Sequence, residues 1–173
     1  MQDLELAAAH WLRYEQQCVL ISLERGGLQW SARPDVFGVT RQRLTIEVEV
    51  KRTVSDFRAN ARKRSVVLRD KLTEIWPAYF YFLAPPHVAE KVLPEVPEWA
   101  GLLTFDARWS QALWPAELVP LKRADRNHDA KPLNLIRLAK MSQAQAGTIV
   151  GLLKRVLYFQ SQTSGDDYQE YTI

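Results

Sequence analysis

The segment LTIEVEVK at residues 44–51 constrains the fold more than any other part of the chain. Its apolar residues are Ile46, Val48 and Val50, and they alternate with the polar residues Thr45, Glu47, Glu49 and Lys51. Alternation with a period of two predicts a β-strand that has one apolar and one charged face. Side chains two positions apart share a face, so Glu49 and Lys51 are expected to project together while Val50 turns into the core.

The segments on either side of this strand predict an α/β fold, with a mixed central sheet flanked by helices. The expected elements, in order, are a helix at 3–16, strands at 18–25, 28–39 and 44–51, a helix at 53–71 capped by Thr53 or Ser55, a strand at 78–86, a short helix at 87–93, a strand at 101–106 and a helix at 133–162. A further strand is expected around 116–121, within an otherwise irregular stretch at 107–132. The last helix has two potential break points, near Ser142 and at Gly147.

The length and composition predict one globular domain over 1–162, followed by a flexible tail at 163–173. The chain has 173 residues, of which 47% are hydrophobic, and this is enough apolar material for a core. No apolar run approaches the roughly 20 residues of a membrane-spanning helix, so we expect a cytoplasmic protein without a membrane partner. The chain has one cysteine, and its three histidines at 10, 87 and 128 are widely spaced. Any metal is therefore expected to be held by carboxylates.

Two carboxylates and one lysine form the arrangement that carries chemistry. Asp35 lies on the strand that precedes LTIEVEVK, so pairing of the two strands would bring it close to Glu49. Carboxylate oxygens are the ligands that Mg²⁺ prefers, and Mn²⁺ could substitute. The backbone carbonyl of Val50 passes the same place and could complete the metal shell. The ammonium group of Lys51 could hold an attacking water and stabilise charge on a phosphate.

Arg33-Pro34-Asp35-Val36 followed by Glu49-Val50-Lys51 resembles the motif of the PD-(D/E)xK, or restriction-endonuclease-like, superfamily. The resemblance implies a core at about 3–84, made of a helix, a three-strand meander, a helix and a strand. The C-terminal helix at 133–162 would be an addition to that core. The runs EVKRTVSDFRAN and YFYFLAPP further resemble bacterial and phage nuclease-like proteins of the MmcB type, for which DNA repair roles are proposed.

Superfamily members often carry another acidic residue on the first helix that reaches the metal. Glu5 is the matching candidate and Glu15 is its competitor, although the helix dipole alone would explain an acidic residue at position 5. Many relatives also place a glutamine-like residue shortly after the lysine, whereas this chain has Arg52 and Thr53. This departure concerns the positioning of the substrate rather than the metal. Glu47 is expected either to support the site from behind or to be solvated.

Basic residues strongly outnumber acidic ones between 51 and 71, although the net charge of the whole chain is only +3. Because the basic residues follow the charged strand directly, they are candidates for contacts with DNA phosphates. These candidates are Arg52, Arg58, Arg62 and Lys63. The alternative is an ordinary solvated helix face.

Together these features predict a Mg²⁺-dependent DNA endonuclease, a hydrolase of phosphodiester bonds that acts in DNA repair, recombination or phage DNA processing. One alternative is a catalytically silent DNA-binding accessory protein with the same fold. Another is a protein-interaction subunit whose basic strip contacts an acidic partner. The small size favours structure-selective over sequence-specific cutting, and the stretch at 107–132 is either a substrate loop or a connector. The apolar face of the last helix could support a homodimer.

Overall fold

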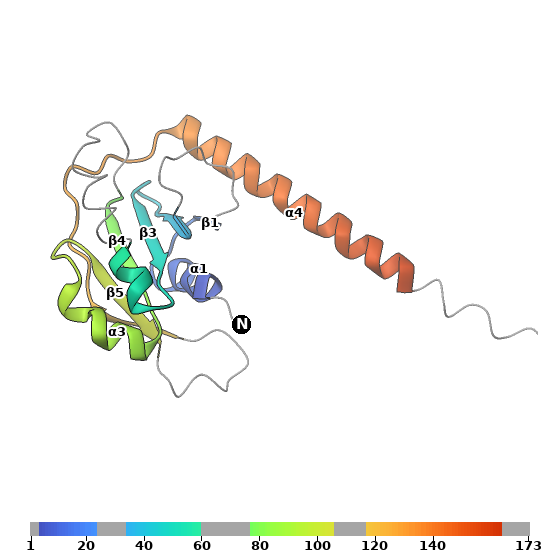
Figure 1. The fold of residues 1–173 in the computed structure, drawn as a ribbon. Coiled ribbons are helices and arrows are strands. Elements are labelled where there is room, and N and C mark those ends of the chain that lie inside the picture. Colours follow the sequence, from blue (N-terminus) through green and yellow to red (C-terminus); the bar gives the residue numbers. More distant parts are fainter. Residues whose placement is uncertain (1–3, 24–33, 60–76, 106–116, 164–173) are drawn as a thin grey trace, which may run out of the picture. The chain divides into compact units, whose positions relative to one another are not determined.

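The computed structural model describes residues 4–23, 34–59, 77–105 and 117–163, and Figure 1 shows its elements. The helices are α1 (Leu4–Tyr14), α3 (Pro86–Val92), the short 3₁₀ helix η1 (Leu93–Glu95) and α4 (Leu135–Thr163), and residues 54–59 are also helical. The strands are β1 (Leu20–Leu23), β2 (Val36–Val39), β3 (Thr45–Val50), β4 (Tyr79–Leu83), β5 (Gly101–Phe105) and β6 (Leu118–Lys122). The predicted segments at 24–33 and 60–76 lie outside the described residues, as does the tail from 164 onward.

Within the described residues, the strands form one six-stranded mixed sheet in the order β1-β2-β3-β4-β5-β6. The pairs β1–β2, β2–β3 and β5–β6 are antiparallel, whereas β3–β4 and β4–β5 are parallel. The mixed α/β architecture predicted from the sequence is therefore confirmed. The strand expected around 116–121 is also present as β6, shifted by one or two residues.

Apolar clusters cover both faces of the sheet. On one face, α1 contributes Leu4, Ala8, Trp11 and Leu12 to a cluster with the apolar residues of β3. On the other face, Phe57 and α3 pack against Phe80 and Phe82 of β4. The helical residues 54–59 begin at a hydrogen bond from the Asp56 amide to Thr53 Oγ1 (3.1 Å), so Thr53 is the cap. The central strands β3 and β4 are thus sandwiched between helices.

The polar face of β3 is buried, although its sequence suggested a strand with one face open to water. Thr45, Glu47 and Lys51 are only 1%, 3% and 2% exposed. In the register of β3 with β4, Glu47 lies opposite Phe80 and Glu49 opposite Phe82. The polar side chains therefore share a face with the cluster around Phe57. This burial excludes a solvated Glu47. The sequence could not predict it, because alternation does not reveal what covers the second face.

Gly101 at the start of β5 leaves room for the ring of Tyr81. A Cβ atom at position 101 would overlap that ring and lie 2.8 Å from the backbone nitrogen of Ala124. The ring has little freedom to move, because it packs edge-on against Trp11 with 5.1 Å between the ring centroids. Overpacking of this kind typically lowers the free energy of unfolding by about 1–3 kcal/mol.

We expect Gly101→Ala to lower the free energy of unfolding by about 2 kcal/mol, measured by urea denaturation. Gly147→Ala in α4 is the matched control, because no atom lies within 4 Å of the added Cβ there. Alanine is a better helix former than glycine by up to about 1 kcal/mol, so the control should match or exceed the wild type. Equal stability of Gly101→Ala and wild type would contradict the proposed close packing.

The chain divides into two compact units, Met1–Asn134 and Leu135–Ile173, and α4 belongs to the second. α4 is one continuous helix of 29 residues. The break near Ser142 or Gly147 that the sequence suggested is therefore wrong, because one glycine weakens a helix by only about 1 kcal/mol and the flanking turns continue through it. Within the described ranges, neither α4 nor any other helix combines the length and apolarity that crossing a bilayer requires.

Candidate active site

Asp35 and Glu49 lie side by side at the end of the β2–β3 pair. Val36 of β2 pairs with Val48 of β3, and continuing this antiparallel register by one residue places Asp35 opposite Glu49. The amide of Val50 donates a hydrogen bond to Asp35 Oδ2 at 2.7 Å, which fixes the aspartate at this position. The expectation that strand pairing brings the two carboxylates together is confirmed.

Lys51 projects from the same face as Glu49, as the spacing of two predicted. Its Nζ atom donates a hydrogen bond to Glu49 Oε2 at 3.0 Å, and the two groups form an ion pair. The lysine is almost fully buried, with a side-chain exposure of 2%, and that of Glu49 is 12%. The Lys51 amide also donates to the carbonyl of Leu83 at 2.8 Å, which ties the lysine backbone to β4. Both the main chain and the side chain of Lys51 are therefore held in place.

Burial dominates the electrostatics of Glu49. The pKa of the Glu49 carboxyl is raised from 4.5 to about 7, chiefly by burial; Lys51 opposes this rise, and the charges of Asp35 and Asp56 contribute to it. When Asp35 and Glu49 are both ionised, they carry one negative charge more than Lys51 offsets. A site of this kind favours either a proton on Glu49 or an additional cation.

The donor set of Asp35 and Glu49 fits a hard divalent cation. Mg²⁺ is commonly bound through one or two carboxylates together with waters and substrate phosphates, rather than by a complete cage of protein ligands. Across the described part of the chain, no group of three His, Cys, Asp or Glu side chains is placed to hold a metal. The pair is therefore suited to a magnesium ion that shares its shell with the substrate, and less suited to zinc.

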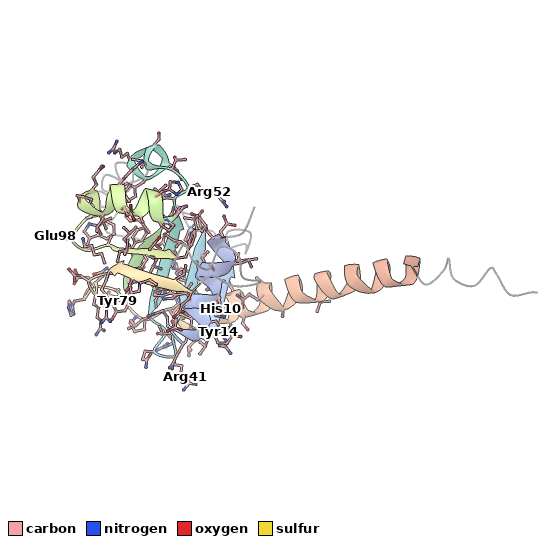
Figure 2. The ribbon with its side chains drawn as sticks, turned by 90° about the horizontal axis from the view of Figure 1, so that it is seen from below. His10, Tyr14, Arg41, Arg52, Tyr79 and Glu98 are labelled. Carbon is pink, nitrogen blue, oxygen red and sulfur yellow. The ribbon has the colours of Figure 1, made fainter. Side chains whose placement is uncertain are left out.

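Glu5 reaches the same end of the sheet from α1. Its Oε1 atom lies 3.5 Å from Arg52 Nη2, and Arg52 directly follows Lys51. Glu15 follows the opposite end of α1, about 15 Å from Glu5 along the helix axis. Of the two acidic candidates, Glu5 is thus the one near the site, where it contacts a basic residue. Figure 2 shows Arg52 and Arg41 on opposite sides of the sheet, as expected for residues after and before β3.

The predicted DNA-contact residues divide into three groups. Arg52 is 45% exposed beside the site. Arg58 instead grips Glu95 at the end of η1 with three hydrogen bonds of 2.6–3.1 Å, so its first partner is a carboxylate of the protein. Arg62 and Lys63 lie outside the described residues. Asp56, which the sequence analysis did not single out, lies close enough for its charge to raise the pKa of Glu49. Its position in the first turn of the helix that follows β3 is the sequence feature that could have identified it.

Cys18 is separate from this site. It is fully buried beside α1, and burial raises the pKa of its thiol to about 12. A thiol with such a pKa is not a nucleophile at neutral pH. Cys18 therefore serves as a small buried hydrophobic residue.

A solved structure of a protein of unknown function from Silicibacter pomeroyi is similar to this chain, with a TM-score of 0.52 and 17% sequence identity. The match covers 98% of this chain and 93% of the other. No protein-family model matches the sequence, and no curated protein matches it. At this level of identity the similarity concerns the fold alone, which is mixed α/β with helices on both faces of the sheet.

Proposed function

We propose that the protein is a Mg²⁺-dependent deoxyribonuclease with a restriction-endonuclease-like fold. The observation that carries the proposal is the grouping of Asp35, Glu49 and Lys51, with Lys51 Nζ 3.0 Å from Glu49 Oε2 and Asp35 anchored on the Val50 amide. Paired carboxylates with a neighbouring lysine are suited to phosphodiester hydrolysis, in which negative charge develops on a phosphate.

The order of elements supports the same proposal. The chain runs through α1, the antiparallel strands β1, β2 and β3, the helical residues 54–59, and β4 parallel to β3. This is the order expected for the core of the superfamily that the motif resembles. Glu49 and Lys51 lie at the end of β3 in this core, with Asp35 opposite Glu49, and the helical residues 54–59, which include Arg58, follow directly.

Each of the three residues has a separate task in this proposal. Asp35 and Glu49 would hold Mg²⁺, which when bound polarises a phosphate oxygen and lowers the pKa of water. The Val50 carbonyl is a further candidate ligand. The ammonium of Lys51 orients the attacking water and offsets the charge that builds on the phosphate. Arg52, exposed next to Lys51, positions a neighbouring phosphate of the strand.

Asp35→Asn tests the proposal with little disturbance of the fold. Asparagine retains an oxygen that can accept the hydrogen bond from the Val50 amide, while the negative charge is lost. We expect cleavage to fall by about 100-fold or more. The matched control is Asp129→Asn, which removes an exposed carboxylate from a turn remote in sequence from the site.

The measurement is cleavage of labelled single-stranded, duplex, flap and four-way-junction DNA in Mg²⁺, Mn²⁺ or EDTA. Cutting should require metal, survive in Asp129→Asn and disappear in Asp35→Asn. DNA binding without cutting, equal in wild type and both variants, would instead identify a silent DNA-binding accessory protein. Absence of both cutting and DNA binding would leave the interaction-subunit alternative.

A further inference from the structure

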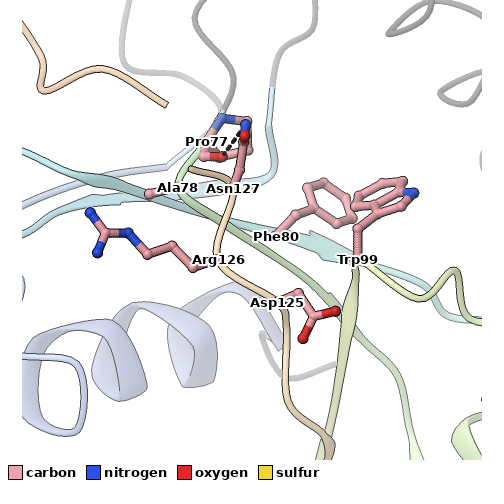
Figure 3. A pocket seen from close by; sticks show the side chains of 7 residues that line it. All are labelled: Pro77, Ala78, Phe80, Trp99, Asp125, Arg126 and Asn127. Atoms are coloured by element: carbon pink, nitrogen blue, oxygen red, sulfur yellow. Dashed lines mark hydrogen bonds between the residues drawn. The ribbon is translucent and has the colours of Figure 1, made fainter. Parts of the chain in front are cut away.

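A concave feature lies at the start of β4. It has a volume of about 240 Å³ and is lined by Pro77, Ala78, Phe80, Trp99, Asp125, Arg126 and Asn127 (Figure 3). Pockets for drug-sized ligands usually measure about 300–1,000 Å³, so this one suits a single small ring system. None of its lining residues belongs to the carboxylate site, and the proposed hydrolysis does not use it.

The backbone around the pocket is held in place by Asn127. The Asn127 amide donates to the carbonyl of Ala78 at 2.9 Å, and its side-chain Nδ2 lies 3.4 Å from the carbonyl of Pro77, the contact drawn in Figure 3. Asn127 Oδ1 in turn accepts from the Asp129 amide at 3.0 Å. The segment after β6 is therefore fixed against the start of β4, and the pocket is formed without a ligand.

One wall of the pocket is aromatic. Phe80 and Trp99 pack with 5.4 Å between their ring centroids and an interplanar angle of 59°. Phe80 is 4% exposed and belongs to the core, whereas Trp99 is half-buried at its edge. A tryptophan that is supported from behind and partly open is a suitable platform for stacking a flat ring.

Two charged residues also line the pocket, whose surface is otherwise mainly apolar. Asp125 and Arg126 are consecutive exposed residues, and in Figure 3 the Asp125 carboxylate lies toward the Trp99 side while the Arg126 guanidinium extends away from it. A carboxylate accepts hydrogen bonds from the N–H groups on the edge of a base. A guanidinium contacts phosphate. Trp99 would thus stack on a base, Asp125 would accept a hydrogen bond from its edge, and Arg126 would contact the phosphate of the same nucleotide.

We propose that this pocket binds one unpaired base of a single-stranded segment of the substrate, an inference that rests on the proposed nuclease function. Phe80 lies opposite Glu47 and Phe82 opposite Glu49, so the aromatic wall and the carboxylate site share one face of the sheet. The pocket lies beside Ala78 at the start of β4, whereas Lys51 is bonded to the carbonyl of Leu83 at the end of this strand, five residues or about 17 Å further along. A single-stranded segment of several nucleotides could therefore contact both places.

The test is a binding cycle in EDTA, where no cutting occurs. A fluorescent single-stranded 12-mer and the same strand with abasic sites are titrated against wild type and Trp99→Leu, and anisotropy is measured. Stacking of one base on an aromatic residue corresponds to about 5- to 100-fold in affinity. We expect Trp99→Leu to weaken binding of the intact strand by at least about 5-fold and to leave binding of the abasic strand unchanged. Glu98→Gln, an exposed neighbour, is the control and should bind both strands like wild type.

A second measurement uses the wild type alone, so it does not depend on the folding of a variant. Photocrosslinking of a strand that carries 5-iodouracil should attach the base to Trp99, as identified by mass spectrometry. The proposal would be overturned if the crosslinks form at residues other than Trp99 and if Trp99→Leu changes the affinity for the intact and abasic strands equally or not at all. Saturation of the pocket by deoxynucleoside monophosphate alone, with affinity equal to that of the strand, would also overturn it and indicate a free-nucleotide site.

The outcome is separable from that of the nuclease test. If Trp99→Leu weakens binding of the intact strand alone and no metal-dependent cutting is found, the nuclease function is refuted and the base pocket remains. If metal-dependent cutting is found but Trp99→Leu binds the intact strand like wild type, only the base pocket is refuted.

Discussion

Lys51→Met is expected to reduce metal-dependent DNA cleavage by at least about 100-fold, because it removes the positive charge that stabilises the transition state. Methionine has a similar length and can occupy the same buried space, in which the lysine is 2% exposed. The loss is therefore attributable to charge rather than to a cavity. Initial rates on the best DNA substrate at saturating Mg²⁺ provide the measurement.

The same substitution affects stability, which offers an internal check. Lys51 lowers the pKa of Glu49, so its removal leaves a buried carboxyl without its cation and makes ionisation still less favourable. The double variant Lys51→Met/Glu49→Gln removes both charges and should recover the stability lost at pH 8. It should not recover cleavage. Because Glu49 is itself a proposed metal ligand, the check on folding is the stability of Lys51→Met to urea under the assay conditions: a folded variant that does not cut attributes the loss to the missing charge.

Lys91→Met is the matched control for this prediction. Lys91 is exposed on α3, and its replacement should leave the cleavage rate within about twofold of wild type. The proposed role of Lys51 would be refuted if Lys51→Met cut DNA as fast as Lys91→Met.

The metal-free protein is expected to lose stability as the pH rises from about 4.5 to above 7. Glu49 has a pKa of about 7 in the folded protein and an ordinary value of 4.5, so over this interval the folded state binds more protons than the unfolded state. Stability falls with pH wherever the folded state binds the extra proton. The rise in pKa corresponds to a loss of about 3 kcal/mol in the free energy of unfolding, complete above the folded pKa.

Urea denaturation in EDTA at several pH values measures this loss. Glu49→Gln cannot ionise, so its stability should lack this decline and should exceed that of wild type at pH 8. Mg²⁺ binds the ionised carboxylate, so it should stabilise wild type more at pH 8 than at pH 5.5 and have little effect on Glu49→Gln. An identical pH dependence in wild type and variant would show that Glu49 is not the buried titrating group.

The sequence predicted β3 and its neighbours because their signals are local. The alternation in 44–51 and the apolar run in 78–86 are complete within one strand each, and both elements are present. Burial of the polar face of β3 was missed because it depends on β4 and on Phe57, which pack from distant positions. A period of two identifies two faces of a strand and says nothing of what covers them.

The candidate site was predictable to a similar extent. The grouping of Asp35, Glu49 and Lys51 follows from strand pairing and a spacing of two, and it is present. The partner of Arg58 was not predictable, because Glu95 lies 37 positions further along the chain and the two meet only through the packing of helices. A basic residue near a candidate site can therefore have a structural partner that local charge counting does not reveal.

The carboxylate of Asp35 has two roles, because it accepts a hydrogen bond from the Val50 amide of the sheet and is also a proposed metal ligand. Functional residues are often neutral or unfavourable for stability, so a lineage that loses an activity is free to replace them. Asp35 differs, because its side-chain oxygen accepts from a main-chain amide beyond the last pair of β2 with β3. Drift after loss of activity should therefore change Lys51 readily and keep an oxygen acceptor, aspartate or asparagine, at position 35. In homologous sequences, an aspartate at this position would be evidence for the fold, whereas the lysine would be evidence for catalysis.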